Sequence, residues 1–178
     1  MTDRKSPVAI SIMYAVIAAV IVLLAVNFYP RDLRQVAGLQ DITPDDITRI
    51  QLSMAIYEEV AGGAVPPRSE LIAQNEIITD RDFFEDVLDM LENHTVRRRL
   101  FSRGVDYRRV DLTRPSIVFL SVSFDNRETL FIDISNDSRF MAIWSGEYAY
   151  TRYRLYGEGV DTNKLYESVL KLNLTPGD

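Results

Sequence analysis

Residues 116–156 read SIVFLSVSFDNRETLFIDISNDSRFMAIWSGEYAYTRYRLY, and this stretch decides the fold. Short runs rich in Ile, Val, Phe and Tyr predict four strands, which span residues 116–124, 128–135, 139–145 and 148–156. Asp-Asn, Asn-Asp and Gly-Glu pairs separate the runs and favour tight turns. Because strands joined by short turns pair antiparallel with their neighbours, the stretch predicts an antiparallel meander.

An amphipathic helix is predicted on each side of the meander. Residues 79–93 start with Thr79 as the expected N-cap, and residues 160–172 start with Asp161 as a candidate cap. Apolar residues recur at helical spacing in both segments, so each helix has one face to bury. Two more strands are expected, at residues 50–56 and 105–112. The order predicts an α+β domain in which two helices cover one face of an antiparallel sheet.

The N-terminal part of the chain has a different character. No charged residue occurs from Ser6 to Pro30, and Val8 to Phe28 forms an apolar run that as a helix would be about 30 Å long, the thickness of a bilayer core. A cleaved signal peptide would start in the same way, but bulky residues follow this long run, which favours an uncleaved signal anchor. The expected organisation is a tail at 1–7, a transmembrane helix at 8–28, a juxtamembrane linker at 29–46 and a soluble α+β domain at 47–174.

A short tail followed by one span and a large domain is typical of a signal anchor that exports its C-terminal domain. We therefore expect a single-pass protein of the cell membrane with an extracytoplasmic domain. In the alternative, cytoplasmic orientation, its arginines would face the anionic inner leaflet. Small residues recur every four positions in the span, at Ser11, Ala15 and Ala19. This spacing has two interpretations: alanine is simply common in such helices, or the small residues let a second copy approach to form a homodimer.

Composition excludes several kinds of chemistry. The 178 residues carry a formal net charge of −6, no Cys and one His, so thiol catalysis and zinc sites built on Cys or several His are not expected. His94 stands where the first helix should end and is interpreted as structural. Asp133, Ser135 and Asp137 have the spacing of a calcium-loop start but lack its later ligands, so they are interpreted as a hairpin turn. We expect no catalytic residue, metal or cofactor; a carboxylate-dependent hydrolase acting on cell-envelope polymers stays the alternative.

Arginine use is the most distinctive feature of the composition. Of the 17 Arg in the chain, seven fall between residues 97 and 114, against two acidic residues there. In the last expected strand, Tyr150, Arg152 and Arg154 share one face, while Tyr153 and Leu155 share the other. Such a surface suits an anionic polymer or an acidic envelope protein, whereas the pI of 4.9 argues against nucleic acid. The alternative is structural: the arginines pair with the acidic residues of the first helix, and the tyrosines serve ordinary sheet packing. The candidate binding residues are Arg97, Arg98, Arg99, Arg103, Arg108, Arg109, Tyr150, Arg152 and Arg154.

Two segments, IITDRDFFEDVLDML at 77–91 and GEYAYTRYRLYGEGVDTNKLYESVLKL at 146–172, flank the hairpin-rich middle. The combination resembles a group of small bacterial domains of unknown function that occur in Gram-positive membrane-anchored proteins and lipoproteins, outside the cytoplasmic membrane. This chain lacks the lipid-accepting Cys of the lipoproteins. The resemblance implies a fold and a location and carries over no catalytic residue. Together these features predict a membrane-anchored binding or scaffolding domain that is not an enzyme.

Overall fold

The computed structural model describes residues 7–58, 68–99, 115, 117–135, 139–146, 150–157 and 159–172. The chain divides into two compact units, Met1–Pro30 and Arg31–Asp178. The first unit contains one helix, α1 (Pro7–Phe28), whose large apolar side chains are exposed wherever they are described. Judged by length and hydropathy together, no helix within the described residues qualifies as a membrane span. The expected helix at 8–28 is thus present as α1, and its insertion in a membrane stays a prediction.

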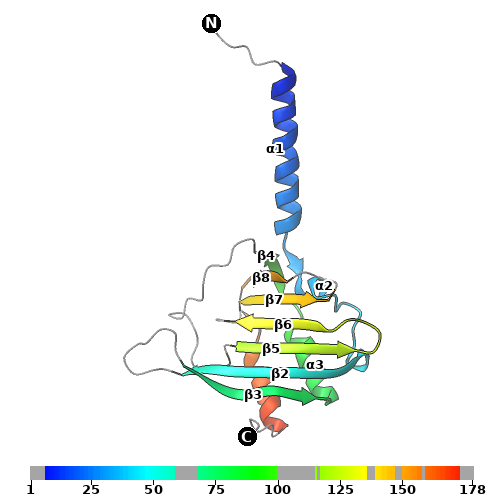
Figure 1. Ribbon diagram of the computed structural model, residues 1–178, viewed down its shortest axis with the longest axis vertical. Coiled ribbons are helices and arrows are strands. Elements are labelled where there is room, and N and C mark those ends of the chain that lie inside the picture. The colour runs from blue at the N-terminus through cyan, green and yellow to red at the C-terminus, as the bar shows by residue number, and fades with distance from the viewer. Residues whose placement is uncertain are drawn as a thin grey trace. The chain divides into compact units, whose positions relative to one another are not determined.

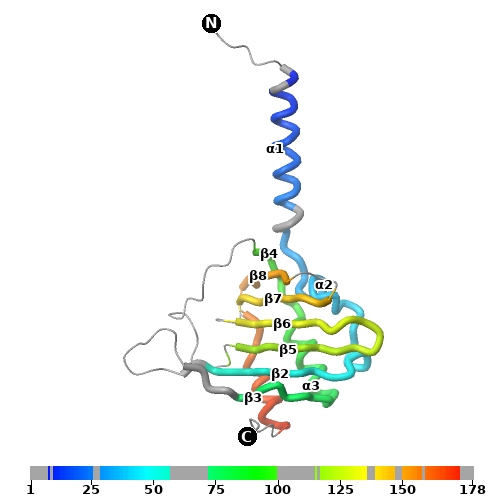
Figure 2. Tube along the Cα trace, viewed as in Figure 1, coloured from blue at the N-terminus to red at the C-terminus, as the bar shows by residue number. Residues whose placement is uncertain are grey.

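Within the described part of the second unit, one antiparallel sheet has eight strands in the order β1-β4-β8-β7-β6-β5-β2-β3 (Figure 1). The strands are β1 (Arg31–Asp32), β2 (Ile47–Glu58), β3 (Arg68–Ile78), β4 (Thr95–Arg98), β5 (Ile117–Phe124), β6 (Leu130–Ser135), β7 (Phe140–Ser145) and β8 (Thr151–Leu155). The α+β class and the antiparallel meander of β5 to β8 are confirmed. The tube in Figure 2 shows that the chain reaches β4 only after running through β2, β3 and α3.

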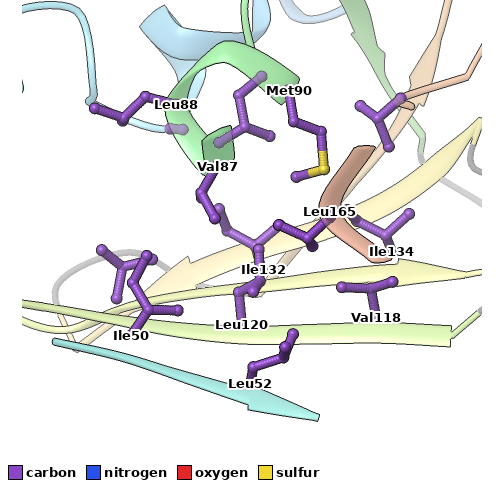
Figure 3. Packing of buried hydrophobic residues seen from close by; sticks show 14 of the residues in the cluster. Ile50, Leu52, Val87, Leu88, Met90, Val118, Leu120, Ile132, Ile134 and Leu165 are labelled. Atoms are coloured by element: carbon purple, nitrogen blue, oxygen red, sulfur yellow. The ribbon is translucent and has the colours of Figure 1, made fainter. Parts of the chain in front are cut away.

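Two helices, α3 (Arg81–Met90) and α4 (Thr162–Lys171), pack on one face of the sheet. Figure 3 shows Val87 and Met90 of α3 and Leu165 of α4 pointing toward Leu120 and Ile132 of the sheet. Two contacts link the helices to each other. Lys164 forms an ion pair with Asp89, with an Nζ–Oδ2 distance of 2.9 Å, and the Ser168 hydroxyl donates a hydrogen bond to Asp86.

Side chains cap both helices at their N-termini. The Asp80 carboxylate accepts a hydrogen bond of 2.9 Å from the backbone N–H of Phe83, and Asp161 accepts one of 3.1 Å from Asn163. The cap at Asp161 was expected. The first helix is capped by Asp80 and not by Thr79, because its first helical residue is Arg81.

The segment expected as a linker belongs to the folded unit from Arg31 onward. It contains β1, the short helix α2 (Leu33–Val36) and the 3-10 turn η1 (Pro44–Asp46), and it buries Leu33 and Leu39 completely or nearly so. The Arg34 guanidinium holds it in place by donating to the backbone oxygens of Leu39 and Ile42. The apolar residues of this segment follow neither a helix nor a strand period over a long stretch, so its place in the folded unit depends on contacts with the rest of the domain.

Three strands, β1, β3 and β4, were not expected. β3 lies at an edge of the sheet and carries polar residues such as Asn75 and Glu76, which hide the alternation that marks a buried strand. β4 has only Val96 as a buried residue among its four. The strand expected at 105–112 and the domain end at 174 lie outside the described residues.

Candidate functional site

The sheet has a second face, here called the outer face, which is turned away from α3 and α4. Strand register places Phe119, Asp133, Ala142 and Arg152 side by side across β5, β6, β7 and β8. Their chain neighbours, such as Leu120 and Ile132, point into the core, because successive side chains of a strand alternate between faces. The outer face therefore combines aromatic, cationic and acidic side chains on a rigid support.

Four rings form an aromatic cluster on this face, and Phe131 and Trp144 lie at its centre as direct cross-strand partners. Their ring centroids are 5.4 Å apart and nearly parallel. Trp144 also contacts Tyr150 at 5.0 Å, and Phe119 joins the cluster at 5.9 Å from Trp144. Tyr150 is 50% exposed, and the other three rings are partly exposed. Such rings offer a flat apolar surface on which the C–H face of a sugar or a planar group can stack.

Arginines gather beside the aromatic cluster because β4 pairs with β8. Arg97 lies opposite Arg154 in the register, and the backbone N–H of Arg99 donates to the Arg152 carbonyl at 2.8 Å. These four residues therefore share the outer face. Arg98 pairs with Tyr153, whose ring packs against the core, and so belongs to the opposite face.

Aromatic rings hold several of these guanidinium groups in place. The Arg99 guanidinium lies 4.6 Å from the centre of the Phe140 ring, and that of Arg154 lies 5.9 Å from the same ring. Arg152 lies over Tyr150 at 5.3 Å, and its Nε donates to the Tyr150 hydroxyl. The outer face thus presents cations already oriented by stacking.

The structure brings together five of the residues that the sequence analysis singled out for binding, and it separates one from them. Arg98 is the separated residue. Arg103, Arg108 and Arg109 lie outside the described residues. The residues that share the outer face are Arg97, Arg99, Tyr150, Arg152 and Arg154.

Asp133 lies within β6 on the outer face, in agreement with the strand expected at 128–135 and not with the hairpin turn to which its spacing from Ser135 and Asp137 was assigned. Burial raises the pKa of this carboxyl, and the charge of Arg152 acts in the opposite direction. Arg152 is two strands away in the same row, with the small Ala142 between them. The alternation of Leu130, Ile132 and Ile134 was the signal that could have placed Asp133 on this face.

His94 makes a structural contact and is not among the outer-face residues. Its carbonyl accepts a hydrogen bond of 2.8 Å from Leu33, which joins β4 to the start of α2. Burial lowers the pKa of its imidazole. Among the described residues, no group of three His, Cys, Asp or Glu side chains gathers in a way that could hold a metal ion.

Comparison of the chain with protein-family models, with curated proteins and with solved structures finds no match. The resemblance to extracytoplasmic Gram-positive domains therefore stays a prediction.

Proposed function

We propose that this chain is a membrane-anchored binding or scaffolding protein whose outer sheet face holds an anionic polymer or an acidic partner of the cell envelope. One observation carries the proposal: the aromatic cluster and four arginines share one sheet face, opposite the helices. The proposed activity is recognition without covalent chemistry.

Folding alone gives little reason for the pairing of Arg97 with Arg154. Arg97 and Arg154 are direct cross-strand partners, and like charges in that position destabilise a sheet. In strands β4 to β8 together with Arg99, the outer face carries four guanidinium groups and one carboxylate, although the whole chain has a net charge of −6. An anionic ligand would relieve the repulsion, so the charge pattern favours a negatively charged partner.

The membrane anchor in this proposal rests on the first unit. α1 exposes its described apolar side chains, and the uncharged stretch of the sequence extends on both sides of them, from Ser6 to Pro30. Burying these side chains in lipid would remove them from water. The proposed location is the cell membrane with the domain outside the cytoplasm; digestion of a C-terminal tag by protease in intact spheroplasts tests it, and protection of the tag would reverse the orientation.

Co-sedimentation tests the binding function. The full chain in nonionic detergent is mixed with insoluble wall polymer from a Gram-positive cell and centrifuged. We expect the chain to sediment with the polymer and expect Trp144→Ala and Arg152→Gln to weaken the association about tenfold each. Arg98→Gln is the matched control on the opposite face. Equal sedimentation of all four proteins, or none, would overturn the proposal.

A carboxylate-dependent hydrolase is the second candidate, and the raised pKa of Asp133 favours it, since a general acid must hold its proton. Strands β5 to β8, however, contain no other acidic residue. Paired-acid hydrolysis needs a second carboxylate within about 5–9.5 Å. Release of new reducing ends from the same polymer, abolished by Asp133→Asn, would establish the hydrolase and displace the binding role.

A further inference from the structure

A pocket of about 220 Å³ lies where β4 meets β8. On the scale of liquid water this is room for about seven water molecules, enough for one charged group with part of its hydration. Among the lining residues that the structure describes, three are arginines and none is acidic. These described residues are Arg97, Arg139, Arg154, Leu155, Tyr156 and Gly157.

Strand pairing explains why the arginines meet here. Arg97 of β4 lies directly opposite Arg154 of β8. The backbone N–H of Leu155 donates to the carbonyl oxygen of Arg139 at 2.9 Å, which brings the residue before β7 to the same corner. The three cations come from positions far apart in the sequence, and the sheet register alone assembles them.

The two cross-strand cations are held by aromatic rings. The Arg97 guanidinium lies 5.9 Å from the centre of the Tyr156 ring, and the Arg154 guanidinium lies 5.9 Å from that of Phe140. An aromatic ring orients a guanidinium group but leaves its charge in place, and the N–H groups can still donate in the plane of the guanidinium. Gly157 adds no side chain to the wall, and its φ of +75° suits glycine.

We propose that this pocket binds a phosphate monoester group, which would be the anionic group of the ligand held by the outer face. This inference deepens the proposed function and rests on it. One guanidinium fork already satisfies both oxygens of a carboxylate, whereas a phosphate monoester has three terminal oxygens and can accept from the forks of Arg97 and Arg154 together. Arg139 also lines the pocket.

Titration calorimetry on the full chain in nonionic detergent tests the proposal, with glycerol 3-phosphate as the probe and acetate as the carboxylate comparison. We expect saturable binding of glycerol 3-phosphate that weakens about tenfold or more in Arg97→Gln and in Arg154→Gln. Arg98→Gln removes the same charge from the neighbouring position on the opposite face and should leave the affinity within about twofold.

Three results would overturn the proposal: no saturable phosphate binding, equal affinity for acetate, or equal weakening by Arg98→Gln. Vesicles of phosphatidylcholine with and without phosphatidic acid identify the source of the phosphate. If vesicles that contain phosphatidic acid displace glycerol 3-phosphate from the pocket, the phosphate group belongs to a lipid. If they do not displace it, the phosphate group belongs to a soluble or polymeric ligand. Trp144→Ala distinguishes failure of the phosphate pocket from failure of the proposed polymer-binding function. This variant should weaken polymer binding and leave the affinity for glycerol 3-phosphate unchanged.

Discussion

The guanidinium group of Arg99 lies 4.6 Å from the centre of the Phe140 ring, and Arg154 lies over the same ring at 5.9 Å. Phe140 belongs to β7, whereas the two arginines come from the end of β4 and from β8. One aromatic ring thus orients guanidinium groups that come from two other parts of the sheet. The energy of the Arg99–Phe140 contact can be measured directly.

A double-mutant cycle between Arg99→Met and Phe140→Leu should give a coupling energy of about 0.5–1 kcal/mol, the value typical of a partly exposed cation–π pair. Urea unfolding of the wild type, both single variants and the double variant supplies the four free energies. Additive effects would mean that the ring contributes packing alone. The pair Arg98→Met and Phe140→Leu serves as the control and should show no coupling.

Asp133→Asn should make the protein more stable near neutral pH. Burial raises the pKa of Asp133 above its ordinary value of 3.8, so the folded state binds this proton more tightly than the unfolded state. The contribution to stability is full below 3.8 and is lost as pH rises through the folded pKa. Thermal unfolding across pH should therefore show a Tm advantage of the variant at neutral pH that shrinks on acidification. A variant that is less stable at pH 7 would show that Arg152 outweighs burial.

His94→Gln should remove part of the acid sensitivity of folding. Burial lowers the pKa of His94 from its ordinary value of 6.5, so the unfolded state takes up the proton first as pH falls. The contribution of His94 to the free energy of unfolding should decline as pH falls from about 6.5 through the lower pKa of the folded state, and it should then level off. Denaturant unfolding at a series of pH values between neutral and 4.5 measures the slope. Identical slopes in both proteins would contradict the prediction.

Asp80→Ala should lower the free energy of unfolding by about 1 kcal/mol, because it leaves the first turn of α3 without its side-chain acceptor. Thr79→Ala is the matched control, one residue earlier, and should change stability by less than about 0.5 kcal/mol. Chemical denaturation distinguishes them. If the Thr79 variant lost more stability than the Asp80 variant, the helix would begin where the sequence pattern alone suggested.

Local patterns in the sequence predicted the elements whose stability is local. The alternation and turn residues of 116–156 marked β5 to β8, and the helical spacing of apolar residues marked α3 and α4. The same alternation placed Leu155 inside and Arg152 outside, in agreement with their burial. Each of these features depends on residues within one turn or one hairpin of each other.

Long-range packing and strand pairing determine where β1, β3 and β4 lie in the sheet, how residues 31–46 fold and which arginines become neighbours. Arg97 and Arg154 are distant in sequence. They become neighbours because β4, which comes after α3 in the chain, pairs with β8. Arg98, one residue away, turns to the opposite face. Local sequence patterns were enough to predict the meander and the two covering helices, and the composition showed the excess of arginine. The site was decided by long-range backbone pairing, because hydrogen bonds between distant strands depend on packing of the whole core and leave little trace in local composition.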